Sequence, residues 1–184
     1  NQSLNSNSGC LILVDTFRAV IISHANEDGT KGGKPREVSQ GQKAKPPGGA
    51  KNIARAIALS LAGDGAAVAI VTLTSMDAAN AVVGEIIGKG GKALVIQADV
   101  AKEADANMIV EKTAAEFGGI DILINNASLR THYPLKELTY ERWRQVMAIN
   151  LDGPYLLARG AMDHLIKSGS GRIVNIGGLS GHIG

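Results

Sequence analysis

The chain has 184 residues, of which 45% are hydrophobic and 3% aromatic, and its formal net charge is +2. This is enough apolar material for the core of one domain, and so small a charge gives no argument for nucleic acid or an anionic membrane as a partner. The single cysteine, Cys10, excludes an intrachain disulfide framework and fits a reducing compartment. No apolar run reaches the roughly 20 residues of a membrane span. We therefore expect a cytoplasmic protein without nucleic-acid or membrane partners.

The first part of the chain, residues 1–46, differs in composition from the rest. Much of it is polar, and residues 23–45 are rich in Gly, Lys, Pro and Gln, which is typical of a loop or linker. Two short apolar runs, residues 11–14 and 19–22, are too short to distinguish strand from helix. We expect residues 1–46 to be atypical and partly disordered, with one of these runs available as a first strand. Residues 47–184 are expected to form a partial domain.

From residue 47 onward, short apolar runs alternate with longer amphipathic segments. The short runs are hydrophobic throughout, which is typical of parallel strands covered on both faces. The longer segments carry hydrophobic residues at helical spacing. We expect strands at residues 67–71, 93–97, 120–125 and 171–176, and helices at residues 52–61, 78–87, 101–117 and 140–165. This alternation predicts βαβ units.

Each expected helix has one apolar face, which we expect to cover the sheet. The side chains placed toward the core are Ile53, Ile57, Ala58 and Leu61, then Val82, Val83, Ile86 and Ile87, then Met108, Ile109, Ala114 and Phe117, and finally Trp143, Val146, Met147 and Ile149.

Several expected strands stop at small and polar residues. The run that ends at Asn125 continues as Asn126-Ala127-Ser128, and the last run, through Asn175 and Ile176, is followed by Gly177 and Gly178. Asp99 and Val100 follow the strand at residues 93–97, and Asn150 interrupts the apolar face of the last helix. In a parallel sheet these strand ends share one edge, which is where such folds bind ligands.

In this order and spacing, the motifs resemble those of the short-chain dehydrogenase/reductase family, over residues 47–184. The resemblance implies an α/β fold with a Rossmann-like, doubly wound parallel sheet and helices on both faces. It implies hydride transfer between a nicotinamide cofactor and a carbonyl or alcohol substrate, and a homodimer or homotetramer if the domain is complete. The family's catalytic Tyr-x-x-x-Lys does not occur in the chain, so we expect the domain to be truncated at its C-terminal end.

The resemblance also assigns cofactor contacts. Gly48 is the first glycine of the family's phosphate-binding turn, while Asn52 and Ala54 replace the second and third. Asp99 matches a residue that touches the adenine ring, although an Asp there also suits the N-cap of a helix that starts at Ala101. The cofactor-binding residues implied in this way are Gly48, Lys51, Asn52, Ile53, Thr72, Asp99, Val100, Asn126, Ala127 and Ser128.

The end of the second strand bears on the choice of cofactor. An Asp or Glu there would bond the ribose 2′-hydroxyl of NAD and repel the 2′-phosphate of NADP. This chain has Thr72 at that point, followed by Leu73, Thr74 and Ser75. Lys51 stands where NADP-preferring relatives carry a basic residue. The sequence thus favours NADP, with NAD as the other possibility.

The catalytic residues are matched less completely. Asn150 matches a family Asn that holds a water linked to the catalytic lysine, and a structural hydrogen bond is the other interpretation of a polar residue there. The family's catalytic Ser falls at Gly178, which has no hydroxyl. Ser180 is the nearest replacement, with His182 also close. The alternative to an enzyme is a dinucleotide-binding or interaction protein that lacks the catalytic Ser and the Tyr/Lys pair.

Overall fold

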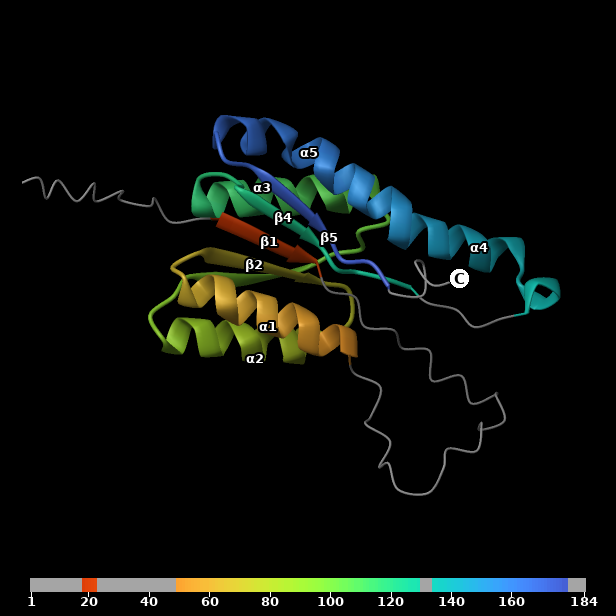
Figure 1. Ribbon diagram of the computed structural model, residues 1–184, viewed down its shortest axis with the longest axis horizontal. Helices are drawn as coiled ribbons and strands as arrows, with labels where there is room; N and C mark the ends of the chain where they lie inside the picture. Colours follow the sequence, from red (N-terminus) through yellow and green to blue (C-terminus); the bar gives the residue numbers. More distant parts are fainter. Residues whose placement is uncertain (1–17, 23–48, 130–133, 179–184) are drawn as a thin grey trace, which may run out of the picture.

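The computed structural model of the chain describes residues 18–22, 49–129 and 134–178 (Figure 1). Its centre is a five-stranded sheet of order β3-β2-β1-β4-β5, in which every neighbouring pair is parallel. The strands are β1 (Arg18–Ile22), β2 (Ala67–Thr72), β3 (Ala93–Gln97), β4 (Ile122–Asn125) and β5 (Arg172–Asn175). The strand order changes direction between β1 and β4, which is the topology of a doubly wound Rossmann-like sheet.

Helices cover both faces of this sheet (Figure 1). They are α1 (Gly49–Gly63), α2 (Met76–Gly88), α3 (Glu103–Phe117), α4 (Tyr140–Met147) and α5 (Gly153–Lys167), with a 3-10 turn η1 (Leu135–Glu137) and a π-helical turn η2 (Ala148–Asp152). One core cluster joins α1 and α2 to one face, and another joins α3 and α5 to the opposite face. The expected fold class is therefore confirmed. None of the described helices is long and apolar enough to cross a bilayer.

The central strand β1 shows why the strands are apolar throughout. Successive side chains of a strand point to opposite faces. Val20 accordingly packs in the cluster under α3 and α5, and Ile21 packs in the cluster under α1 and α2. Because both faces of the strand are covered, polar and apolar side chains do not alternate along it. Of the two apolar runs considered for the first strand, residues 19–22 form β1, and residues 11–14 lie outside the described part of the chain.

Some side chains predicted to be in the core are exposed instead. Ile87 is 55% exposed, because it lies roughly 100° around α2 from the buried Ile86. Ile53, near the start of α1, is 43% exposed. Trp143 is 47% exposed because α4 extends past the end of the sheet, as Figure 1 shows, and no α4 residue is buried. At Ile53 and Ile87 the helical spacing was right but the predicted apolar stripe was too wide, whereas Trp143 lies on a helix that extends past the sheet.

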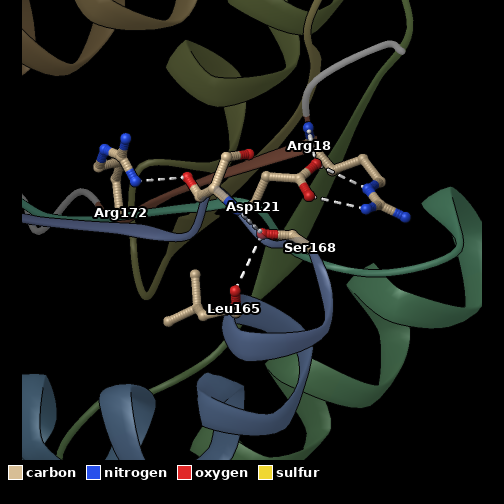
Figure 2. A network of polar contacts seen from close by, with 6 residues as sticks. Arg18, Asp121, Leu165, Ser168 and Arg172 are labelled. Carbon is tan, nitrogen blue, oxygen red and sulfur yellow. Dashed lines mark hydrogen bonds and ion pairs between the residues drawn. The ribbon is translucent and has the colours of Figure 1, made fainter.

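The amino-terminal edge of the sheet is held by a polar network around Asp121 (Figure 2). The Arg18 guanidinium donates two hydrogen bonds of 2.7 Å to the Asp121 carboxylate, and the Arg18 backbone N–H donates a third of 2.8 Å. The Asp121 N–H donates to the Arg18 carbonyl, and the Asp121 carbonyl accepts from the Arg172 N–H. Asp121 thus connects the start of β4 to β1 through its carboxylate and its backbone N–H, and to β5 through its backbone carbonyl.

The turn before Asp121 leaves room for this network. Gly119 has a φ of +155°, and a Cβ atom there would lie 2.8 Å from a guanidinium nitrogen of Arg18. A side chain at this position would therefore displace the arginine that pairs with Asp121. The side-chain hydrogen bonds of Arg18 hold the pKa of the Asp121 carboxyl below its usual value, against the opposing effect of burial.

Candidate cofactor site

The candidate site lies at the opposite, carboxyl-terminal edge of the same sheet. Since all strands are parallel, the ends of β2, β3, β4 and β5 bring Thr72, Asp99, Asn126 and Asn175 to this one edge. Helix α1 begins at Gly49 directly after the segment that follows β1. The ends of β1 and β4 flank the change in strand order, which is where open α/β sheets bind ligands.

Thr72 ends β2 beneath the surface, with 2% of its area exposed. Its hydroxyl oxygen accepts a hydrogen bond of 3.2 Å from the Ser75 N–H, and its carbonyl accepts one of 3.1 Å from the Ala98 N–H. These contacts fix the turn from β2 into α2 and attach it to the end of β3. The exposed part of this turn is thus made by the residues after Thr72, among them Thr74, and it carries no acid.

Asp99 stands just beyond β3 and is half-buried. Its carboxylate accepts a 3.1 Å hydrogen bond from the Ala101 N–H, and its backbone N–H donates to the Asp105 carboxylate at 2.8 Å. Helix α3 starts at Glu103 with Lys102 as its N-cap residue, so Asp99 does not cap a helix that starts at Ala101. It closes the turn before α3 instead, which orients the Asp99-Val100 backbone at the edge of the sheet.

The end of β4 carries the unsatisfied polar atoms of the site. Asn125 donates a 2.8 Å hydrogen bond to the side-chain oxygen of Asn175 on β5. The Asn125 side-chain oxygen and the Asn126 side-chain nitrogen are buried without a partner among the described residues. A buried amide without a partner costs about 1–3 kcal/mol, so these two atoms call for an explanation beyond packing.

Asn150 lies in the π-helical turn η2 between α4 and α5. Its amide makes a reciprocal pair with the backbone of Leu129, accepting from the N–H at 2.8 Å and donating to the carbonyl at 2.9 Å. Helical π-turns are rare and occur often at functional sites. The structural hydrogen bond considered for Asn150 is therefore present, and it fixes the loop that follows Asn126, Ala127 and Ser128.

Sequence reasoning missed two contributors to this arrangement. Leu129 matters through its backbone, which leaves no signal in a sequence. Gly153 starts α5 against Val100, and a Cβ atom on it would lie 3.1 Å from a Val100 methyl carbon and 3.2 Å from the Val100 carbonyl oxygen. The sequence signal that could have identified Gly153 was its position directly after the turn that contains Asn150. The glycine lets α5 press against the Asp99-Val100 turn.

The remaining predicted residues are only partly described. Lys51 and Asn52 lie in the first turns of α1, where the structure describes the backbone alone. Gly48, Ser180 and His182 lie outside the described residues, and Gly178 is exposed beyond the end of β5. Among the described residues, no group of His, Cys, Asp and Glu is arranged to hold a metal ion. The structure thus brings together Thr72, Asp99 to Val100 and Asn126 to Ser128.

The sheet order and the polar strand ends define an α/β protein of the Rossmann-like class. Within that class, residues 47–184 match the short chain dehydrogenase family, and the chain belongs to this family. A 3-oxoacyl-(acyl-carrier-protein) reductase of Synechocystis sp. is 36% identical over 137 residues, which are 74% of this chain and 56% of that protein. The chain therefore spans about half the length of the curated relatives it matches.

Solved structures give the same result. A short chain dehydrogenase from Burkholderia cenocepacia in complex with NADP has a TM-score of 0.70 and 32% identity, over 89% of this chain and 56% of that one. A blue fluorescent protein from a metagenomic library, in complex with NADPH, has a TM-score of 0.71 and 29% identity, over 91% and 58%. The described residues fit a dinucleotide on a separate ground: the buried side-chain nitrogen of Asn126 has no partner among them, and the turn from Thr72 to Ser75 carries no acid.

Proposed function

We propose that the chain acts in an NADP-dependent oxidoreductase that moves a hydride between a nicotinamide and a carbonyl or alcohol carbon. The observation that carries this proposal is the side-chain nitrogen of Asn126, a buried donor without a partner among the described residues, beside the change in strand order. The ribose and phosphate oxygens of a dinucleotide are acceptors of the kind such a donor lacks.

Each part of the site has a distinct task in this proposal. The free N–H groups at the start of α1 receive the pyrophosphate, aided by Gly48, Asn52 and Ile53. Asp99 and Val100 hold the adenine, while Asn126, Ala127 and Ser128 lie under the nicotinamide ribose. Asn150 keeps that loop in place through Leu129. The bound nicotinamide supplies the hydride chemistry, and the protein orients it.

Two features favour NADP over NAD. The turn from Thr72 to Ser75 has hydroxyls and no carboxylate, so nothing there repels a 2′-phosphate. Lys51 contributes a positive charge at the start of α1. The relatives from Burkholderia cenocepacia and the metagenomic library, which were solved with NADP and NADPH, are consistent with this preference.

A dinucleotide-binding protein without turnover is the second candidate function. Gly178 favours it, because a glycine cannot donate a hydrogen bond to a substrate oxygen where the family has its catalytic Ser. Ser180, two residues further on, is the residue we propose as a replacement. The substrate would be a small carbonyl or alcohol compound in the first case and absent in the second.

We propose also that the protein forms a homodimer through α4, η2 and α5. Helix α5 buries Leu157, Ala161 and Leu165 against α3 and the sheet. Its opposite face, continued by α4 and η2, exposes a group of large apolar side chains, namely Tyr140, Trp143, Leu151, Tyr155, Met162 and Ile166. Large exposed apolar side chains gathered along neighbouring helical segments favour an interface. The Ile166→Glu change should shift the measured mass to that of a monomer, whereas Ile87→Glu on α2 should not.

The experiment that tests the proposed function is titration of the purified chain with NADPH and with NADH, followed by the nicotinamide fluorescence. Saturable binding that is tighter for NADPH supports the proposal, and assays with carbonyl substrates then separate the enzyme from the protein without turnover. Failure of a folded sample to bind either nucleotide would overturn both candidate functions.

A further inference from the structure

A small cavity of about 40 Å³ opens between α1, α2 and the end of β2. It is lined by Ala54, Arg55, Ile70, Thr72, Ser75, Ala78, Ala79 and Val82. Arg55 is the only one of these residues that carries a charge. It lies four residues after Lys51, and residues at that spacing share one face of a helix. The cavity therefore joins an arginine to the strand end expected to read the adenosine ribose.

The polar groups on the other wall of the cavity suit an anion. Ser75 precedes α2 and makes no capping hydrogen bond with its hydroxyl. Thr72 directs its hydroxyl oxygen to the Ser75 N–H, which holds the two residues in one tight turn. No carboxylate lines the cavity. An anionic oxygen above this turn would meet hydroxyl donors on one side and the Arg55 guanidinium on the other.

Arg55 already has an anionic partner, which is Glu85 on α2, at 2.5 Å. Glu85 also pairs with Lys89 at 2.9 Å, so one carboxylate is shared between two cations. The pKa of Glu85 is lowered, first by its hydrogen bond with Lys89 and further by the charges of Arg55 and Lys89, so the group is ionised at neutral pH. If Arg55 leaves, Glu85 therefore keeps a partner. The pair is also half-exposed, so its separation costs little.

We propose that Arg55 is a specificity-determining residue for the adenosine 2′-phosphate, and that it exchanges Glu85 for this phosphate when NADP binds. The inference rests on the proposed function, because it needs a chain that binds NADP. A phosphate offers more charge and more acceptor oxygens than one carboxylate, and the planar arginine fork matches it with paired hydrogen bonds. Lys89 makes the exchange possible because it retains Glu85. Glu85 thus competes with the cofactor for one cation.

Replacing Arg55 and replacing Glu85 should have opposite effects on the affinity for NADPH. Arg55→Gln should weaken NADPH binding about fivefold and leave NADH within about twofold, as expected for one part-exposed charged contact. Glu85→Gln should tighten NADPH about threefold, because Arg55 is then free. Lys89→Gln leaves Glu85 with Arg55 alone, so it should weaken NADPH slightly. The readout is the equilibrium dissociation constant of each nucleotide, and unfolding in urea reports the stability of each variant.

The outcomes separate this inference from the function on which it rests. If Arg55 and Glu85 only join α1 to α2, both variants lose stability and shift NADPH and NADH binding alike, which overturns the role of Arg55. If the unaltered chain prefers NADPH and Arg55→Gln keeps that preference, the inference fails and the proposed cofactor stands. If the unaltered chain binds neither nucleotide, the proposed function fails and the inference falls with it.

Discussion

Each edge of the sheet buries a polar side chain to the same extent, but the two side chains differ in their hydrogen-bond partners. Asp121 at the amino-terminal edge and Asn126 at the carboxyl-terminal edge are each 5% exposed. Asp121 accepts three hydrogen bonds from Arg18 alone, whereas the Asn126 side-chain nitrogen has no partner among the described residues. At one edge the buried carboxylate has its hydrogen bonds within the protein, and at the other a buried donor has none that the described residues supply.

This difference follows from how the chain enters the strands at one edge and leaves them at the other. At the amino-terminal edge the chain enters the strands from tight turns, such as that at Gly119, which bring Arg18 against Asp121 (Figure 2). At the carboxyl-terminal edge β2 and β3 lead through short turns into α2 and α3, and helix starts present unpaired N–H groups. The proposed function places ligand binding at the end of the strands opposite to the Asp121 network, so mutations can separate the two.

The largest expected effect is at the stabilising edge. The Asp121→Ala change leaves the Arg18 guanidinium without its buried partner, and breaking such a pair costs about 3 kcal/mol of unfolding free energy. Urea denaturation measures the loss. The matched control is Glu103→Ala, which breaks the exposed pair with Arg159 and should cost less than about 1 kcal/mol. Equal losses for the two variants would mean that the Asp121 network is no more than a surface ion pair.

The turn that admits Arg18 should be nearly as sensitive. The Gly119→Ala change adds a methyl group 2.8 Å from the guanidinium, at a φ that side chains rarely adopt, and should cost about 2 kcal/mol. Gly88→Ala is the control, because a Cβ atom there meets nothing within 4 Å and Gly88, the last residue of α2, does not have a positive φ. It should leave the thermal unfolding midpoint unchanged or raise it. A Gly119 variant as stable as the Gly88 variant would show that Arg18 moves away at no cost.

The cofactor edge should respond in the opposite sense. Asn126→Ala removes a buried donor without a partner, so stability should stay constant or rise by up to about 1 kcal/mol. The same change should weaken NADPH about tenfold, the equivalent of one lost hydrogen bond from a buried site. The control is Asn125→Ala, which breaks the bond to Asn175 and should lower stability by about 1 kcal/mol. A destabilised Asn126→Ala would show that this amide supports the fold.

Much of the fold follows from patterns that the sequence carries openly. The bounds of β3 coincide with those predicted, and β2 and the first three helices differ by a few residues, because apolar runs and helical spacing reflect burial on two faces. The helix predicted at residues 140–165 is divided by η2 into α4 and α5. The predictions that failed concern residues whose surroundings are set by a second helix or strand. Trp143 fits an apolar face, but α4 extends past the sheet and leaves it exposed. Nor does local pattern show that Arg18, beside a short apolar run, reaches Asp121 across the sheet.

The site was predicted through its motifs more than through its contacts. The sequence placed Thr72, Asp99 and Asn126 at the carboxyl-terminal edge of the sheet because they end or follow strands, and the structure has them there. The reciprocal bonds of Asn150 with the Leu129 backbone could not be found, because the partner is a peptide group that any residue would supply. Arg55 was overlooked because an arginine four residues into an amphipathic helix is ordinary until Glu85 is placed opposite it. Contacts between distant segments are set by the fold rather than by local spacing.

The smallest expected effect is a difference in pH dependence between the two edges. Arg18 holds the pKa of Asp121 below its unfolded value, so the stability it adds is complete above pH about 4 and is lost as the pH falls through the lower folded value. The loss is smaller than that in Asp121→Ala, because a protonated carboxyl keeps some of its hydrogen bonds. The Asn126 amide does not titrate in this range. Urea midpoints measured at pH about 7, 4 and 3 should fall more steeply for the unaltered chain than for Asp121→Asn. Parallel curves would show that Asp121 is no better stabilised as an anion in the folded protein than in the unfolded chain.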